Sequence, residues 1–273
     1  MSAFNFLKKA KDIAINVGPV WTTIVYQDKV ITNVPSVVAM KGEKAIATGI
    51  RALELENCTP EGVRIIHPMK DGVISDFNAT EQLVNNLLTN AFGHCGLSGQ
   101  RFNIIWVIPP GMTEVERCAI RDIASHLGDR SVRMVFAPLA ATIGIGKNVN
   151  SPEGRLIIDV GTTTTDISTV SLGGLVCSKT ILADWQKDNT RCFEKISDAV
   201  NEVLKQTPPE LRADIEKEGA SLIGDGAYLN GLDTYLQQHI GIQFHIAEEP
   251  ELAAVTGADY ALRYKEHYFF FIR

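Results

Sequence analysis

The sequence predicts an α/β protein built from two related lobes. Strand-like and helix-like segments alternate along most of the chain, which is the pattern of α/β folds. One short motif, an apolar strand residue followed by Asn or Asp, an apolar residue and glycine, occurs twice, at 15–18 and at 158–161. The chain has 273 residues, and single hydrophobic cores usually stop growing at about 250 residues. These observations indicate an internal duplication and two lobes.

The spacing of apolar residues predicts the elements of the first half. The run FNIIWVIP at 102–109 is continuously apolar, which is typical of a strand buried on both faces. Thr113 and Glu116 form the pattern that opens a helix, and Gly128 ends that helix. Strands are expected at 13–25 (a hairpin), 36–40, 45–48, 102–109 and 132–135, and helices at 76–92, 113–127 and 139–144.

The second half repeats this rhythm. Gly161 and the pair Gly173-Gly174 separate three apolar runs, which predicts a three-stranded meander. Strands are expected at 156–160, 165–171, 175–181, 220–223 and 243–246, and helices at 192–204, 229–239 and 250–264. Because strands and helices alternate in this order, the sequence predicts a largely parallel central sheet.

The composition excludes some classes of protein. The formal net charge of −6 gives no field that would attract a polyanion, so no nucleic-acid partner is expected. The five cysteines are scattered without a CxxC pair, which indicates neither a zinc site nor a disulfide framework and fits a reducing cytosol. No apolar stretch approaches the roughly 20 residues of a membrane helix. We therefore expect a cytoplasmic protein.

Residues 1–11 allow two interpretations. Apolar residues on one helical face and lysines on the other predict a short basic amphipathic helix in peripheral contact with a membrane. A solvated terminus ahead of the first strand is the alternative, because so short a helix is marginal alone.

Residues 159–166 (DVGTTTTD) have the chemistry of a phosphate loop. A glycine turn between two strands presents backbone N–H groups to phosphate oxygens, and an acidic residue at the end of a strand can hold Mg²⁺ through water. Turns rich in glycine and threonine are also common without any ligand, so the spacing alone leaves an ordinary hairpin as the alternative.

The string IIDVGTTTTDISTVSLGG at 157–174 resembles the second phosphate loop of the MreB family. The resemblance continues in the family's order through HPMKDGVISDF at 67–77, TEVERCAIR at 113–121 and IAEEPELAAVTGADYALR at 246–263, and it covers nearly the whole chain. It implies an actin-like fold, a duplicated ribonuclease H-like arrangement of two lobes. It also implies that ATP and Mg²⁺ bind between the lobes and that subunits assemble into filaments that guide cell-wall growth.

The resemblance also implies the domain boundaries. The first lobe would span 1–149, with a small outer subdomain at about 30–73, and the second lobe would span 150–273. The family has a further outer subdomain in the second lobe, where this chain has only residues 182–191, so one small subdomain is expected to be missing. The C-terminal helix is expected to return toward the first lobe. The tail HYFFFIR is apolar for a chain end, which predicts packing against the first lobe, with a membrane or partner contact as the alternative.

Two departures from the family concern the chemistry. In the first phosphate loop, Asn16 replaces the family's aspartate, and Pro19 follows the retained Gly18. Asparagine has no carboxylate for a hydrated magnesium ion, and proline has no backbone donor. Ala137 replaces the family's catalytic glutamate, so no catalytic residue is assigned and hydrolysis by the family's mechanism is expected to be lost.

The second loop keeps more of the family's pattern, with Asp159 as the expected metal-binding residue. The residues that the resemblance assigns to the cofactor are Asn16, Gly18, Asp159, Gly161, Thr162, Thr163, Thr164, Thr165, Gly224, Asp225 and Gly226. The family has three successive glycines in the loop that binds the nucleoside, and Asp225 stands at the middle one, between Gly224 and Gly226. Its carboxylate either points to solvent or ribose, or repels an anionic ligand.

Three functional hypotheses follow from the resemblance. The first is a cytoskeletal filament or scaffold component in cell-shape and cell-wall organisation, which associates with itself in the cytoplasm or at the inner face of the membrane. The alternative is a non-enzymatic adaptor or regulator that binds a full-length MreB homologue or another membrane-associated partner. The third is an ATPase of altered mechanism that uses Asp166 or Asp225 in place of the lost glutamate.

Overall fold

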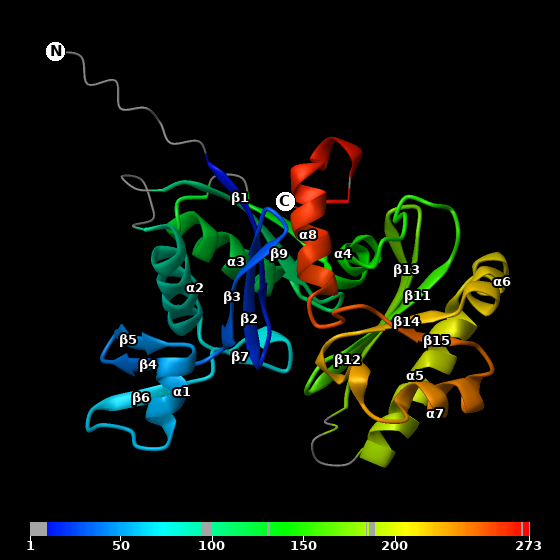
Figure 1. Ribbon diagram of the computed structural model, residues 1–273, viewed down its shortest axis with the longest axis horizontal. Coiled ribbons are helices and arrows are strands. Elements are labelled where there is room, and N and C mark those ends of the chain that lie inside the picture. The colour runs from blue at the N-terminus through cyan, green and yellow to red at the C-terminus, as the bar shows by residue number, and fades with distance from the viewer. Residues whose placement is uncertain are drawn as a thin grey trace.

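The computed structural model describes residues 10–93, 100–129, 132–183, 185, 189–268 and 270–272. Two five-stranded sheets form two lobes that lie side by side (Figure 1). The first sheet has the order β10-β9-β1-β2-β3. Its strands are β1 (Lys11–Val17), β2 (Trp21–Tyr26), β3 (Lys29–Pro35), β9 (Phe102–Ile108) and β10 (Arg133–Phe136).

The second sheet has the order β13-β12-β11-β14-β15. Its strands are β11 (Arg155–Val160), β12 (Thr164–Ser171), β13 (Gly174–Leu182), β14 (Ala220–Ile223) and β15 (Phe244–Ile246). In each sheet the first three strands of the lobe form an antiparallel meander, and the two later strands add in parallel beside the first. The two lobes therefore share one topology, as the repeated motif predicts.

The prediction of one largely parallel sheet is wrong. Each sheet contains two antiparallel and two parallel pairings. Links of two or three residues join the strands of each meander, and such short links permit only antiparallel neighbours. The later strands follow helices, which supply the crossovers that parallel pairing needs. The helix–strand alternation thus describes only the second part of each lobe.

The helices are α1 (Ile50–Glu56), α2 (Phe77–Phe92), α3 (Glu114–His126), α4 (Ala137–Gly144), α5 (Asn189–Gln206), α6 (Pro209–Glu218), α7 (Leu232–Ile240) and α8 (Ala253–Arg263). Two helices, α2 and α3, begin where their capping residues predict. Asp76 accepts a hydrogen bond from the Ala79 N–H at 2.9 Å and caps α2. Thr113 and Glu116 form the predicted capping box of α3. Three starts differ from the prediction by three residues: α5 begins earlier, at Asn189, whereas α7 and α8 begin later, at Leu232 and Ala253. Before α7 the chain forms a short 3₁₀ helix (Asp225–Tyr228).

A small three-stranded sheet with the order β5-β4-β6 lies outside the first sheet and packs against α1 (Figure 1). Its strands are β4 (Val38–Lys41), β5 (Lys44–Thr48) and β6 (Val63–Ile66). It begins later than the expected range of about 30–73, because β3 continues the meander of the larger sheet. A two-stranded hairpin, β7 (Met69–Lys70) and β8 (Val73–Ile74), follows it.

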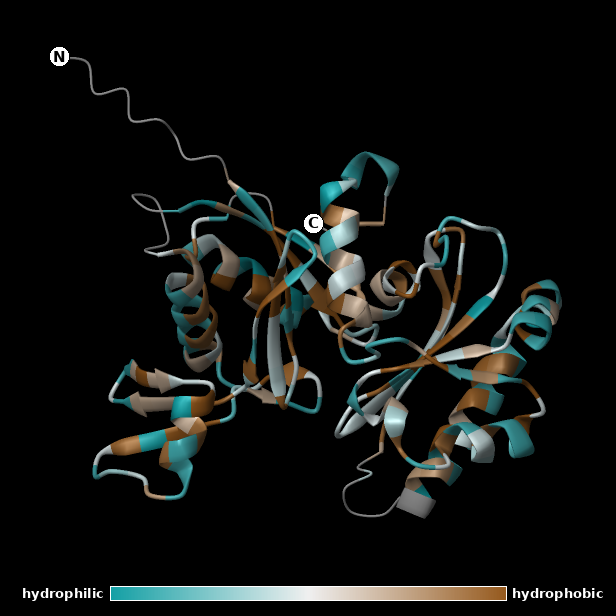
Figure 2. Cartoon of the chain, in the orientation of Figure 1, coloured by the Kyte–Doolittle hydropathy of each residue, from teal (hydrophilic) through white to brown (hydrophobic). Residues whose placement is uncertain are grey.

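Hydrophobic residues run along the strands of both sheets, whereas α6 on the outside is largely hydrophilic (Figure 2).

The lobes meet through α4 and α8. One hydrophobic cluster combines Val135 of the first sheet, Ile157 of the second and residues of both helices. The helices cross so closely that a Cβ on Gly257 would lie 1.9 Å from the Ala140 carbonyl oxygen. A Cβ on Gly144 would lie equally close to the Ala253 oxygen.

The C-terminal tail reaches the first sheet. Ile272 and Met134 exchange two backbone hydrogen bonds of 2.9 Å, so the tail pairs with β10. Within the described ranges, no helix combines the length and the apolar character that crossing a membrane requires. Residues 1–9 of the predicted amphipathic segment, and residues 184 and 186–188 of the shortened connection, lie outside the described residues.

Candidate functional site

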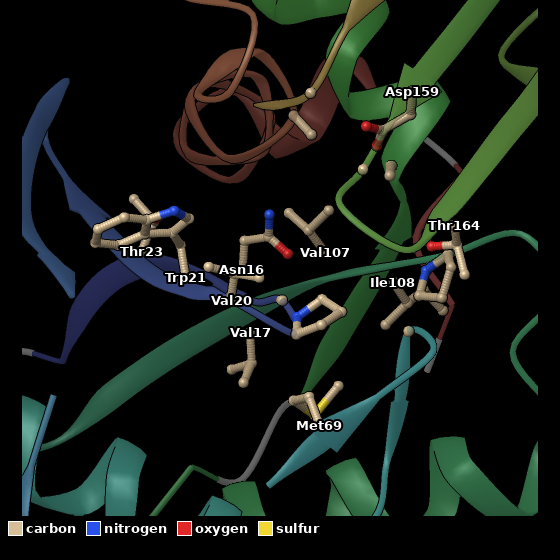
Figure 3. Close-up of a pocket in the computed structure, with 18 of the residues that line it drawn as sticks. Asn16, Val17, Val20, Trp21, Thr23, Met69, Val107, Ile108, Asp159 and Thr164 are labelled. Atoms are coloured by element: carbon tan, nitrogen blue, oxygen red, sulfur yellow. The ribbon is translucent and has the colours of Figure 1, made fainter. Parts of the chain in front are cut away.

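A cavity of about 360 Å³ lies between the turns of the two meanders. Asn16, Val20 and Trp21 of the β1–β2 hairpin approach it from one side, and Asp159 and Thr164 of the second lobe approach from the other (Figure 3). Its volume is within the range of small-molecule sites. The duplicated motif therefore brings its two copies to one place.

The β1–β2 turn offers few groups to a ligand. The Gly18 N–H donates to the Trp21 carbonyl at 2.8 Å, so the turn satisfies this donor itself. Pro19 has no N–H, and the Val20 carbonyl accepts from the Ser36 N–H. Asn16 lines the cavity with a neutral amide, as expected from the sequence. This side of the cavity can hold a phosphate group only weakly.

The β11–β12 turn keeps the geometry of a phosphate loop. Asp159 is half-buried at the end of β11, and Gly161, Thr162 and Thr164 line the cavity after it. A Cβ on Gly161 would lie 2.9 Å from the Thr164 carbonyl oxygen, so the turn requires glycine there. The predicted residue Thr165 is buried and does not reach the cavity.

The loop at 224–226 packs directly onto the end of β11. Gly224 has a φ of 85°, and a Cβ there would lie 2.4 Å from Asp159 Oδ1. Gly226 is buried, and its Cβ would lie 2.6 Å from Val160 Cγ1. Only glycine permits this approach. Asp225 lies at the rim, where the Thr162 side chain hydrogen-bonds its carboxylate.

Carboxylates dominate the electrostatics of the cavity. Burial, together with the nearby charges of Asp166 and Asp225, raises the pKa of Asp159 to about 7. Burial raises the pKa of Asp166 to about 6, although the Thr180 hydroxyl, which donates to it, opposes the shift. Burial and the charge of Glu251 raise the pKa of Asp225. The carboxylates therefore destabilise one another's ionised forms.

In the part of the chain that the structure describes, no basic side chain offsets these charges within the cavity. None of the described residues that line it is lysine, arginine or histidine. Across the described residues, no three His, Cys, Asp or Glu side chains are placed to hold a metal ion by themselves.

The predicted catalytic position carries no reactive group. Ala137 is the first residue of α4 and lines the cavity with a methyl group. A methyl group can neither accept a proton nor orient water. The alternatives that the sequence suggests, Asp166 and Asp225, both line the cavity. Each carboxylate accepts a side-chain hydrogen bond, from Thr180 and Thr162 respectively.

The structure brings together most of the predicted residues. Those that line the cavity are Asn16, Gly18, Asp159, Gly161, Thr162, Thr164, Gly224 and Asp225, whereas Thr163, Thr165 and Gly226 lie behind it. Sequence reasoning missed the apolar wall formed by Met69, Trp106 and Met112, and also the acidic Glu251. The run FNIIWVIP places Trp106 on a buried strand, but no sequence signal aims it at a site.

Comparisons with known proteins agree with this arrangement. The sequence model described as "MreB/Mbl protein" matches residues 10–187 and 183–268. The chain is 28% identical to the cell shape-determining protein MreB of Escherichia coli K12, with 93% of each chain covered. It is 29% identical to the cell shape-determining protein Mbl of Bacillus subtilis, with 88% of this chain and 92% of Mbl covered.

A solved structure shows the same fold. The crystal structure of MreB 5 of Spiroplasma citri bound to AMPPNP superposes with a TM-score of 0.84 at 22% identity, covering 95% of this chain and 98% of that one. The alignment with E. coli MreB spans 325 positions, but 93% of 273 residues is about 254, so about 70 positions have no residue here. The two segments matched by the family meet at 183–187. The match of nearly the whole chain shows that this protein belongs to the MreB/Mbl family.

Proposed function

We propose that this protein is an actin-like cytoskeletal component that assembles with copies of itself and acts in cell-shape and cell-wall organisation. The proposal is carried by one observation: the family match covers nearly the whole chain, and the cavity lies where the duplicated turns of the two lobes converge. The relatives it matches are named as cell shape-determining proteins.

We propose that the cavity holds a nucleotide such as ATP together with Mg²⁺. The fit rests mainly on the second lobe, where glycine turns leave room for close backbone approach at Gly161 and Gly224. Asp159 is the carboxylate that would face the hydrated cation. The bound Mg²⁺ would supply the positive charge that the lining side chains lack. The proposal also includes the remaining residues that the sequence assigns to the cofactor, which are Asn16, Gly18, Thr162, Thr163, Thr164, Thr165, Asp225 and Gly226.

We propose the lobe boundaries at 1–149 and 150–273, with the outer subdomain of the second lobe absent from the connection at 182–191. The roughly 70 aligned positions that this chain lacks, and the meeting of the matched segments at 183–187, support this assignment. Ala137 supports the further proposal that bound nucleotide is held without hydrolysis by the family's mechanism. A cytoplasmic location, with residues 1–11 in contact with the inner membrane face, completes the proposal.

Sedimentation tests the assembly part of this proposal. We expect the purified chain to pellet at high speed when Mg²⁺ and AMPPNP are present and to remain in the supernatant with Mg²⁺ alone. The physical reason is that a ligand between the lobes fixes their relative orientation, which repeated subunit contacts require.

A second sample, in which this chain is mixed with filaments of a full-length MreB, distinguishes an adaptor from a protein that assembles with itself. A chain that stays soluble with nucleotide but pellets with full-length MreB filaments would contradict self-assembly and favour an adaptor. A chain that pellets in neither sample would contradict both.

A further inference from the structure

The short connection that replaces the missing stretch is itself hydrogen-bonded to the β11–β12 turn. The Ala183 N–H donates to the Thr163 carbonyl at 3.0 Å. The Trp185 indole N–H donates to the Gly161 carbonyl, also at 3.0 Å. Both donors lie in the segment where the two family matches meet. The connection therefore binds two alternate carbonyl groups of the same turn.

These two hydrogen bonds set the direction of the turn's N–H groups. A trans peptide is planar, and its N–H points opposite to its C=O. Because the carbonyls of Gly161 and Thr163 point toward the connection, the N–H groups of Thr162 and Thr164 point away from it. Both threonines line the cavity, and so does Gly161. The connection thus fixes the direction of two backbone donors at the cavity wall.

Trp185 also joins the turn to the loop at 224–226. A Cβ on Gly226 would lie 3.0 Å from the indole Nε1, so the indole packs against this glycine. The hydrogen bond between Thr162 and Asp225 links the same two loops at the rim. The partly buried indole also packs on the core of the second lobe, which limits its movement.

We infer that Trp185 is a positioning residue for phosphate binding in this shortened chain. Through Gly161 it holds the Thr162 N–H toward the cavity, and the Ala183 N–H does the same for Thr164 through the Thr163 carbonyl. The ligand class is the phosphate groups of a magnesium-bound nucleotide. The inference rests on the proposed nucleotide function and adds a role for a segment created by the shortening.

Substitution of Trp185 by phenylalanine tests the inference. The W185F variant keeps an aromatic ring but loses the indole donor. Titration calorimetry with Mg²⁺ and AMPPNP should show binding weakened about 2- to 12-fold, the range for loss of one neutral hydrogen bond. The Tyr264→Phe variant is the matched control, because it removes one hydroxyl from an exposed ring of the same protein. Its affinity should stay within about twofold of the wild-type value.

Nuclear magnetic resonance gives a readout that general loss of stability would not produce. In the wild-type chain, Mg²⁺ and AMPPNP should shift the backbone amide signals of Thr162 and Thr164 strongly, and W185F should reduce the shift of Thr162 more than that of Thr164. The wild-type measurement stands even if the variant folds poorly. Unshifted Thr162 and Thr164 signals in a wild-type chain that binds AMPPNP, or equal affinities of wild type and W185F, would overturn the role of Trp185 alone. No binding by the wild-type chain would overturn the nucleotide function and the inference with it.

Discussion

Replacing Gly257 with alanine is expected to lower the free energy of unfolding by about 3 kcal/mol or more, at the upper end of the range for overpacked interiors. The new methyl group would lie 1.9 Å from the Ala140 carbonyl oxygen and 2.7 Å from the Gly144 nitrogen. Both are backbone atoms, so no change of rotamer relieves the clash. The helices α4 and α8 must separate, and they carry the contact between the lobes.

The expected loss exceeds the gain that alanine usually brings to a helix, which is about 1 kcal/mol relative to glycine. Urea unfolding followed by circular dichroism measures the difference. Gly174→Ala is the matched control, because a Cβ there meets only the Ser171 oxygen at 3.7 Å. If G257A were as stable as G174A, the close crossing of α4 and α8 would be refuted.

Replacing Asp159 with asparagine is expected to stabilise the ligand-free protein at pH 8 and to leave its stability nearly unchanged at pH 4. The pKa of Asp159 is about 7 in the folded chain, raised first by burial and then by Asp166 and Asp225. In the unfolded chain an aspartate titrates near about 3.9. Between these values the folded state binds a proton that the unfolded state has released.

The sign follows from proton linkage. Where the folded state binds more protons, stability falls as pH rises, so the wild-type chain loses stability between about pH 4 and pH 7 and no further through this group above that. Asparagine lacks this titration. The difference in unfolding free energy between D159N and wild type should therefore grow across this window to the order of 4 kcal/mol.

Thermal unfolding from pH 4 to pH 8, with a chelator to remove divalent ions, measures this difference. Asp198→Asn is the matched control, since it makes the same chemical change on the exposed face of α5. A D159N minus wild-type difference that stays constant with pH would mean that Asp159 does not titrate in this window. The acidic character assigned to the cavity would then be wrong.

The sequence predicts those features that depend on neighbouring residues. The strand-turn-strand motif at Gly161 and the capping box of Thr113 and Glu116 are local patterns, and the structure contains both. The repeated motif also predicts that the lobes share a topology. Each of these features can be read from a window of about ten residues, because turn and cap chemistry acts over that distance.

Other features depend on residues far apart in the chain. The contact of Gly257 with Ala140 joins two helices that are far apart in the chain. In the sequence alone, Gly257 looks like an ordinary glycine within a helix. The coupling of Asp159 with Asp225 requires the turn after β14 to pack on β11. The bond from Trp185 to Gly161 depends on how a shortened connection folds back. Local spacing carries no information on these contacts.

The proposed binding of a magnesium-bound nucleotide, between the duplicated turns and through the second lobe, can be measured directly. The measurement is titration calorimetry with ATP, with and without Mg²⁺, on the wild-type chain and on Asp159→Ala. We expect saturable binding that requires Mg²⁺ and is lost in the variant, with no release of phosphate. Absence of binding at millimolar ATP, or equal binding by Asp159→Ala, would contradict the proposal.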